Sequence, residues 1–397
     1  MKRLFILAAT AFLTTMTVMA QQNTNLSGQN RNYISTGMPI LMVAPDALSG
    51  AMGDAGAASE PDAYSAHWNN AKFAFTDNDV GISTTYTPWL RNLGLSDMNL
   101  LYLGAYKRIN KNETLAASIT YFSLGDIKST SAEGNDEGTF SPNEMAVDAT
   151  YAMKLNKNLS LGATGRYIRS DLTNGMTIND GSGYRRTKAA PSVAADVGLY
   201  YENTVDNQTE FAIGGMISNL GAKLSYSDDD PKKEFLPANL RIGGRYSYEV
   251  DSYNAFNILL DFNKLLVPTP PINDEDNNTY GYYENMTDYY NTGVVQGVFN
   301  SFFDAPGGFR EELQELQISF GAEYWYNHTF AARAGYFYEH ANKGGRKYLT
   351  VGFGVKFNMT QFDFAYLLPT TQYSTNPLAN TIRISLTLNL SHNKVPP

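Results

Sequence analysis

Residues 349–357 read Leu349-Thr350-Val351-Gly352-Phe353-Gly354-Val355-Lys356-Phe357. Apolar side chains occupy every second position, with small or polar ones between them, which is the period of a β-strand with two unlike faces. The same alternation runs through residues 316–324 and 382–390, and earlier through 115–121 and 145–151. The chain is therefore expected to form a sheet with one apolar and one polar face.

Applied to the whole chain, this pattern predicts about fourteen strands, each near the roughly 9–11 residues of a tilted membrane-spanning strand. Their expected centres are Ile82, Leu103, Ala117, Ala149, Ala163, Val197, Ile213, Gly243, Ile258, Phe320, Ala334, Phe353, Phe364 and Leu386. No segment after residue 20 approaches the roughly 20 apolar residues of a spanning helix. A position in a membrane then requires a closed sheet, because lipid leaves open strand edges unsatisfied.

The N-terminus has the pattern of a secretory signal peptide. Lys2 and Arg3 precede an apolar run that is too short to span a bilayer, and small residues end at Ala20. The sequence therefore divides into a signal peptide (1–20), an N-terminal periplasmic or plug segment (21–76), a barrel (77–390) and a C-terminal tail (391–397).

Composition agrees with a barrel and excludes other classes. The 397 residues include 27 Tyr, 21 Phe and 33 Gly but only 17% charged residues, which suits a lipid-facing wall around a lumen of small and polar side chains. The absence of Cys excludes disulfides and thiolate chemistry. A net charge of -9 argues against a nucleic-acid partner, which needs a basic face.

The connections between predicted strands alternate in length. Short ones fall at 110–113, 156–158, 327–328 and 358–359, and long ones at 123–142, 169–190, 219–236 and 264–313. Outer-membrane barrels have short periplasmic turns and long extracellular loops. The sequence therefore predicts a multi-pass barrel of the cell outer membrane, with both termini in the periplasm.

Catalytic chemistry has little support in the sequence. The four His residues are scattered, and no zinc helix motif, nucleophile elbow or phosphate loop is present. We expect no enzyme, no cofactor and no metal, and Asp228-Asp229-Asp230 lacks the spacing of a calcium loop. Charged residues on the predicted inner face indicate a lumenal ion-pair network, with a substrate-selective pore as the alternative; they are Asp148, Arg166, Asp196, Arg241, Arg245, Glu323, Arg333, Asp363 and Arg383.

Aromatic residues near strand ends are interpreted as interface girdles rather than a ligand cage. This set comprises Tyr86, Trp89, Tyr102, Tyr106, Tyr248, Tyr324, Trp325, Tyr336 and Tyr338. Glycines within strands, such as Gly243, Gly244, Gly352 and Gly354, are expected to ease curvature or close packing.

A run of small residues before the first strand breaks the alternation. It reads Ala51-Met52-Gly53-Asp54-Ala55-Gly56-Ala57-Ala58 and is followed by Pro61-Asp62-Ala63 and His67-Trp68-Asn69. Such residues allow close backbone approach, which favours a plug or lining inside the barrel. The candidate plug motif comprises Gly53, Asp54, Gly56, Asp62, His67, Trp68 and Asn69.

These motifs resemble the N-terminal signature of FadL-like outer-membrane barrels, which have fourteen strands and an N-terminal plug. Within them the chain is most similar to the PorV family, the outer-membrane shuttle proteins of the type IX secretion system of Bacteroidetes. Asn70 is one departure, because many relatives carry Pro there. The resemblance extends over the mature chain.

The resemblance implies a carrier without catalytic activity. Such proteins bind the C-terminal signal domains of secreted cargo at a large outer-membrane translocon barrel. They deliver this cargo to a sortase-like attachment complex at the cell surface. The implied partners are therefore the secreted cargo, the translocon barrel, the sortase-like attachment complex and outer-membrane lipid. The alternatives are a FadL-like transporter of hydrophobic small molecules, and a structural barrel that scaffolds other envelope proteins.

Cargo outside the cell has to meet the long loops, and the loop at 264–313 is rich in aromatic and apolar residues. Residues 291–304 within it are expected to form a short amphipathic helix. A self-packed lid over the barrel mouth is the alternative to a partner surface. The candidate contacts are Tyr280, Tyr282, Tyr283, Tyr289, Tyr290, Val298, Phe299, Phe302 and Phe303.

Overall fold

The structure is a computed structural model of the chain. It describes residues 33–91, 97–130, 136–173, 175, 177–179, 184–228, 232–273, 279–370, 378 and 380–390. The predicted signal peptide, the C-terminal tail, and the acidic residues at 229–230 and 274–276 lie outside the described residues.

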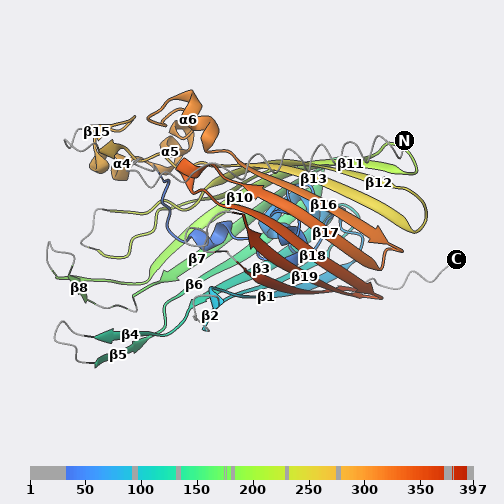
Figure 1. Cartoon of the computed structure of the whole chain (residues 1–397), viewed down its shortest axis with the longest axis horizontal. Helices are drawn as coiled ribbons and strands as arrows, with labels where there is room; N and C mark the ends of the chain where they lie inside the picture. The colour runs from blue at the N-terminus through green and yellow to red at the C-terminus, as the bar shows by residue number, and fades with distance from the viewer. Residues whose placement is uncertain are drawn as a thin grey trace. The chain divides into compact units, whose positions relative to one another are not determined.

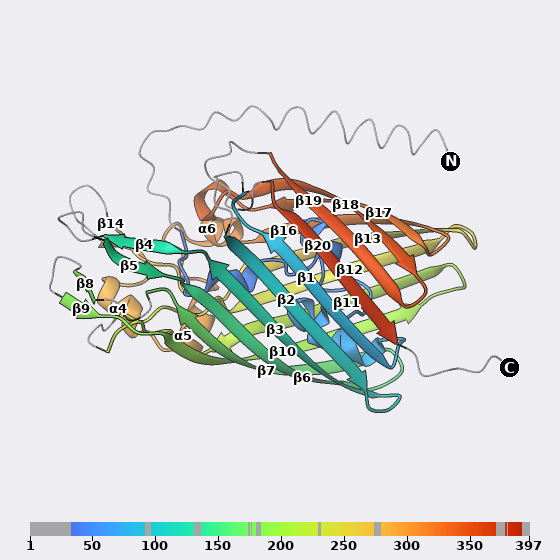
Figure 2. The same cartoon turned by 90° about the horizontal axis from the view of Figure 1, so that it is seen from below.

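One antiparallel sheet closes into a barrel of fourteen strands (Figure 1, Figure 2). The strands are β1 (Val80–Pro88), β2 (Met98–Arg108), β3 (Glu113–Leu124), β6 (Asn143–Lys154), β7 (Leu159–Asp171), β10 (Ala190–Thr204), β11 (Thr209–Gly221), β12 (Asn239–Glu249), β13 (Asn254–Leu265), β16 (Gln317–Tyr326), β17 (Phe330–Tyr338), β18 (Lys347–Phe357), β19 (Thr360–Pro369) and β20 (Ile382–Leu390). β20 pairs with β1, with Val80 opposite Leu390, and this closes the barrel. Every predicted strand centre lies in one of these strands, in order, so the predicted fold class is confirmed.

The two faces of the wall differ as the alternation predicts. On β18, Leu349, Val351 and Phe353 are exposed on the outer face, whereas Tyr348 and Thr350 are buried on the inner face. Apolar side chains therefore cover the outside, where hydrocarbon solvates them.

The predicted aromatic girdle is partly wrong. Trp89, Tyr102, Tyr106 and Trp325 are buried. Tyr102 and Tyr106 share the parity of the inward Leu100 on β2, and Trp325 shares that of the inward Glu323 on β16. Tyr86 and Tyr248 are exposed on the outer wall, and Tyr324, Tyr336 and Tyr338 are half-buried. Abundance of aromatic residues near strand ends does not show which face they occupy, whereas their parity does.

The extended loops gather at one end of the barrel, here called the long-loop end (Figure 1, left). They carry the hairpins β4 (Ile127–Thr130) with β5 (Asp136–Phe140), β8 (Thr177–Asn179) with β9 (Tyr184–Arg186) and β14 (Ile272–Asn273) with β15 (Thr279–Tyr280), and the helices α4 (Met286–Asn291), α5 (Val294–Asn300), α6 (Phe309–Gln314) and η4 (Ala341–Lys343). The opposite, short-turn end has tight turns, for which Asn327, His328 and Asn358 take positive φ.

Residues 39–75 lie inside the barrel as a plug that contains η1 (Pro39–Met42), α2 (Ala47–Gly50), α3 (Ser65–Trp68) and η2 (Asn70–Phe75) (blue in Figure 2). The segment before it lies at the long-loop end, where the amide of Gly37 donates to the carbonyl of Phe235 at 2.8 Å. The plug leads to the short-turn end, where the amide of Arg108 donates to the carbonyl of Asp79. The described chain therefore begins at one end of the barrel and finishes, at Leu390, at the other.

The prediction that both termini lie on one side concerns residues 1–32 and 391–397, which are outside the described residues. No helix in the described part of the chain has the length and apolar content needed to cross a membrane.

Candidate functional site: the filled lumen and the long-loop surface

The first part of the plug motif makes a tight turn against the wall. Gly53 and Asp54 both have positive φ, and the amide of Gly53 donates to the Thr350 hydroxyl at 2.8 Å. The Asp54 carboxylate accepts a 2.6 Å hydrogen bond from the Tyr348 hydroxyl and lies 3.6 Å from the Arg383 guanidinium. Gly53 is required here, since a Cβ would lie 2.6 Å from the backbone of Tyr336.

Asp261 on β13 holds the next turn of the plug. Its buried carboxylate accepts from the amides of Gly56 at 2.7 Å and Ala57 at 2.8 Å. The plug runs so close to the wall that a Cβ on Gly214 of β11 would lie 2.0 Å from the Ala57 carbonyl oxygen. A Cβ on inward glycines of other strands would lie 2.1–2.6 Å from plug atoms at Gly162, Gly198, Gly321, Gly335 and Gly352, and 3.0 Å from Ala57 at Gly243.

The second part of the motif packs at the centre of the lumen. Asp62 accepts from Tyr64 and Ser65 at the beginning of α3. The Trp68 indole donates to the Asp46 carboxylate at 2.5 Å. The His67 ring packs edge-on against the indole ring of Trp68.

Two asparagines continue these contacts to the wall. The Asn69 side chain donates to the carbonyls of Ala57 and Leu199. The side chain of Asn70 donates to the Thr164 hydroxyl at 3.0 Å. Asn70 therefore supplies a further polar contact between plug and wall.

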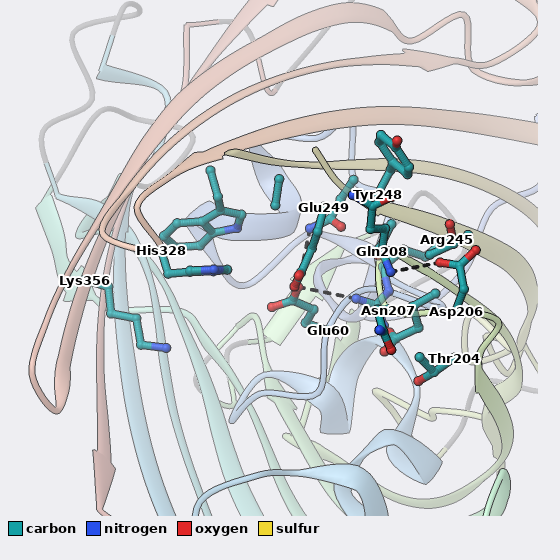
Figure 3. A pocket seen from close by; sticks show the side chains of 16 residues that line it. Glu60, Thr204, Asp206, Asn207, Gln208, Arg245, Tyr248, Glu249, His328 and Lys356 are labelled. Carbon is teal, nitrogen blue, oxygen red and sulfur yellow. Dashed lines mark hydrogen bonds and ion pairs between the residues drawn. The ribbon is translucent and has the colours of Figure 1, made fainter. Parts of the chain in front are cut away.

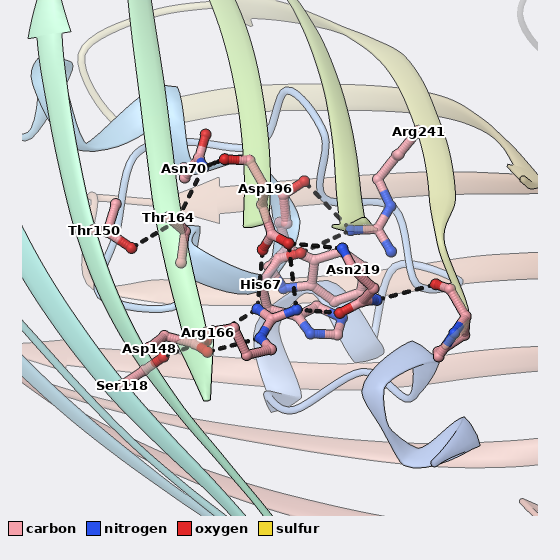
Figure 4. A network of polar contacts seen from close by, with 12 residues as sticks. His67, Asn70, Ser118, Asp148, Thr150, Thr164, Arg166, Asp196, Asn219 and Arg241 are labelled. Atoms are coloured by element: carbon pink, nitrogen blue, oxygen red, sulfur yellow. Dashed lines mark hydrogen bonds and ion pairs between the residues drawn. The ribbon is translucent and has the colours of Figure 1, made fainter. Parts of the chain in front are cut away.

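Arginines on the inner wall form the predicted charge network around the plug (Figure 4). Arg166 lies between Asp148 at 2.7 Å and Asp196 at 3.0 Å, and all three side chains are buried. Its guanidinium also donates to Asn219. Buried charges are tolerated only when they are paired and hydrogen-bonded, so these side chains fix the wall around the plug.

Two further predicted lumenal arginines also have partners inside the barrel. Arg333 pairs with Glu323 at 2.6 Å and with Asp363 at 2.7 Å. Arg241 donates to the carbonyls of His67 at 3.1 Å and Trp68 at 3.3 Å, which attaches the plug directly to β12.

A polar vestibule opens at the short-turn end (Figure 3). Two adjoining cavities of 210 and 110 Å³ share Glu60, Arg245, Asn257, Trp325 and Lys356 as lining residues. Arg245 pairs there with Glu210 at 2.5 Å, Glu202 at 3.3 Å and Glu60 at 3.4 Å. The lining carries both signs of charge, with acidic residues in excess of Arg245 and Lys356.

Above the vestibule the lumen is filled. A cavity of only 20 Å³ lies between Trp68, Arg241 and Tyr348. Closer to the long-loop end, an apolar cluster packs Met38 and Leu41 of the N-terminal segment against wall and loop residues such as Leu100, Phe122 and Leu236. Among the described residues, little open volume therefore remains between the vestibule and the long loops.

The long loop, residues 266–316, presents only part of the predicted partner surface. Tyr283 and Tyr289 are buried with Phe235 and Val267 in an aromatic cluster, and Ile34 packs against it. Val298 and Tyr290 are half-buried. Tyr283 and Tyr289 therefore belong to the core of a self-packed lid, and partner contact by the candidate residues of this loop stays a prediction.

Other side chains of the long loop point outward. Phe299 is 64% exposed and Phe303 63%, and Tyr282 and Phe302 are also exposed. Tyr280 lies in β15. The predicted amphipathic helix exists as α5, whose inner side carries the buried Gly297 and Asn300.

Two exposed residues were missed by the sequence analysis. Phe309 and Leu313 of α6 are 78% and 52% exposed. Their spacing of four places them on one helix face, a signal that was present in the sequence.

Comparisons with solved structures support the barrel fold. The "TodX monoaromatic hydrocarbon channel deltaS2 mutant" is similar with a TM-score of 0.52 at 12% identity, over 88% of this chain and 99% of that one. The "TodX deltaS2S3 mutant monoaromatic hydrocarbon channel" has a TM-score of 0.51 at 12% identity, over 87% and 99%. The Pseudomonas putida toluene transporter TodX has a TM-score of 0.49 at 11% identity, over 90% and 98%. At such identities the two mutant structures show a shared barrel fold and nothing more.

No curated protein matches the chain. The family model described as "Type IX secretion system protein PorV" matches residues 26–272, which include the plug motif and the strands through β13. The fold and the match together indicate an outer-membrane location. The chain belongs to the PorV family of type IX secretion system proteins.

Proposed function

We propose that this outer-membrane protein binds the C-terminal signal domains of secreted cargo at the translocon and carries them to the attachment complex without catalysing a reaction. Membership of the PorV family supports this proposal. The structural observation that carries it is a filled lumen beneath a long loop with exposed phenylalanines. A carrier of folded domains needs an external contact surface rather than a conduit.

The binding surface in this proposal is the exposed side of α5 and the residues next to it. Phe299 and Phe303 are four residues apart and both face away from the lid core, whereas Gly297 packs against Pro268 and Phe235. Exposed aromatic residues on a well-packed base are typical anchors of protein interfaces. Tyr282, which packs edge-on against the buried Tyr283, adds a third exposed ring.

The test is co-purification from cells in mild detergent. A tagged full-length protein is expected to recover cargo that carries C-terminal signal domains, together with the translocon barrel and the attachment complex. The double variant Phe299→Ser, Phe303→Ser should lose most of the cargo. Val205→Ser is the matched control, because Val205 is 59% exposed but lies in a short turn. Recovery of no cargo, together with normal secretion after deletion of the gene, would contradict the proposal.

A FadL-like transporter of hydrophobic molecules remains the second candidate because of one feature. The register between β10 and β11 shifts between Ala195 and Val197, where a transporter of this kind needs a kinked strand. At this shift the amide of Asn219 donates to the Asp196 carboxylate at 2.7 Å. A growth defect restricted to one hydrophobic nutrient after gene deletion would favour this alternative.

A further inference from the structure

The helix α6 packs on the outside of the barrel. Lys264 lies near the end of β13, where Asn263 faces the lumen and bonds Arg241, and Phe262 is exposed on the outer wall. Strand alternation therefore points Lys264 outward, yet it is buried. Its ammonium is covered by the carboxylates of Glu312 at 3.0 Å and Glu315 at 2.6 Å.

A second lysine holds the same helix at the rim. Lys343, in the loop between β17 and β18, pairs with Glu311 at 2.5 Å and Glu315 at 3.0 Å. The hydroxyl of Thr269 donates to Glu315 as well. With Glu315 thus fixed toward the wall, the orientation of α6 around its axis is determined.

The other face of α6 points away from the barrel. Phe309 and Leu313 lie on the side of the helix opposite Glu315, by the 100° turn per residue, and both are exposed. The exposed ring of Phe302 lies 5.9 Å from the Lys264 ammonium. An apolar ridge, here defined as Phe302, Phe309 and Leu313, therefore faces outward at the level of Lys264.

This ridge continues the lipid-facing wall. Below Lys264, the outer face of β13 carries the exposed Ile258, Leu260 and Phe262, and that of β16 carries Phe320. Amphipathic helices with bulky apolar residues on one face bind the boundary between headgroups and acyl chains. We propose that α6 is an interfacial helix whose ridge inserts Phe302, Phe309 and Leu313 into the outer leaflet of the membrane.

Such a helix ties the lid to the bilayer. The ion cluster of Lys264, Lys343 and Glu315 fixes α6 to the rim, and the ridge fixes it to lipid. The rest of the long loop is then held at a constant height above the membrane. This inference goes beyond the proposed carrier function, since it assigns a lipid contact that does not involve cargo.

The test uses the absence of cysteine from the chain. Single variants Phe309→Cys, Leu313→Cys and Phe302→Cys of the full chain carry a nitroxide label. They are reconstituted in vesicles of phosphatidylethanolamine and phosphatidylglycerol, with no other protein. Relaxation by oxygen, which concentrates in lipid, is compared with relaxation by a water-soluble nickel complex. Leu260→Cys marks the lipid-facing wall, and Lys157→Cys marks an exposed short turn.

The ratio of oxygen to nickel accessibility at the ridge is expected to shift from the value at Lys157 toward that at Leu260. Ratios at all three ridge positions equal to that at Lys157 would overturn the proposal and indicate a ridge that awaits a protein partner. Heat-dependent gel mobility shows whether each variant is folded. With three labelled positions, the test can still be made if one variant fails to fold. Because the vesicles hold no cargo, the result does not depend on the carrier function.

Discussion

At the scale of single residues, the inward glycines of the wall fix how close the plug can come. Gly214 is the tightest case, because a Cβ there would lie 2.0 Å from a backbone oxygen of the plug, which cannot move aside as a flexible side chain does. The Asp261 carboxylate holds that same stretch of plug in place with two amide hydrogen bonds.

Gly214→Ala is therefore expected to displace the plug and to destabilise the barrel by about 1–3 kcal/mol, the usual cost of overpacking. Gly244→Ala is the control, since that glycine faces outward and its nearest neighbour would be 3.6 Å away. The measurement is the temperature at which the folded form disappears in heat-dependent gel mobility. Equal temperatures for the two variants would show that the close approach is not needed.

The presence of glycines in the strands predicted the close contact between wall and plug only in part. Strand glycines such as Gly243 and Gly352 were expected to ease curvature or close packing, and both do meet the plug. Gly244, next in the sequence, meets nothing closer than 3.6 Å. Strand parity distinguishes the inward Gly243 from the outward Gly244. It does not identify the plug residue that Gly243 meets, Ala57, which lies nearly two hundred residues earlier in the sequence.

At the scale of elements, the described residues of the long loop, 266–273 and 279–316, form a small folded unit. Its aromatic core joins Tyr283 and Tyr289 to Phe235 from another loop, and its base is the ion cluster around Glu315. The pattern of apolar residues predicted a helix within 291–304, and α5 lies there. This pattern could not predict that Tyr282 is exposed and Tyr283 buried, because the burial of Tyr283 depends on Phe235, a residue of a different loop.

The loop also contains a pH-sensitive group. Burial, together with the nearby carboxylates Glu312 and Glu315, raises the pKa of Asp304 to about 7. A raised pKa means that the folded loop holds a proton that the unfolded loop releases, so loop stability is present at low pH and is lost as pH rises through 7.

Hydrogen exchange provides the measurement. The Thr269 amide, which donates to Asp304 at 3.2 Å, should lose protection between about pH 5.5 and about pH 8, after correction for intrinsic rates. Asp304→Asn keeps the acceptor neutral and should remove most of this dependence. Identical pH profiles for the two proteins would exclude Asp304 as the source.

At the scale of the whole molecule, the barrel is a wall around a solid interior. Among the described residues, apolar packing fills the lumen near the long loops and buried ion pairs fill its centre, and the larger lumenal cavities lie in the vestibule at the short turns. Alternation along single strands was enough to predict the strands, their order and the inner position of the charged residues. The contacts between plug and wall could not be predicted from this alternation, because they join residues that only the folded barrel brings together.

A filled lumen predicts that the purified full-length protein gives no steady single-channel current in a planar lipid bilayer. Hydrated ions need a continuous aqueous path, and the plug is attached to the wall by Arg241, Asp261 and Thr350. An open porin in the same apparatus serves as the positive control. Regular, ohmic current steps from the wild-type protein would contradict a permanently seated plug.

The entry of the plug from the long-loop end has a consequence for how the chain crosses the bilayer. Fourteen strands alone are an even number of crossings, which returns a chain to the side from which it started. The plug adds one more passage through the lumen, and the total becomes odd. Reporter domains joined before Tyr33 and after Leu390 would then be displayed on opposite faces of the membrane.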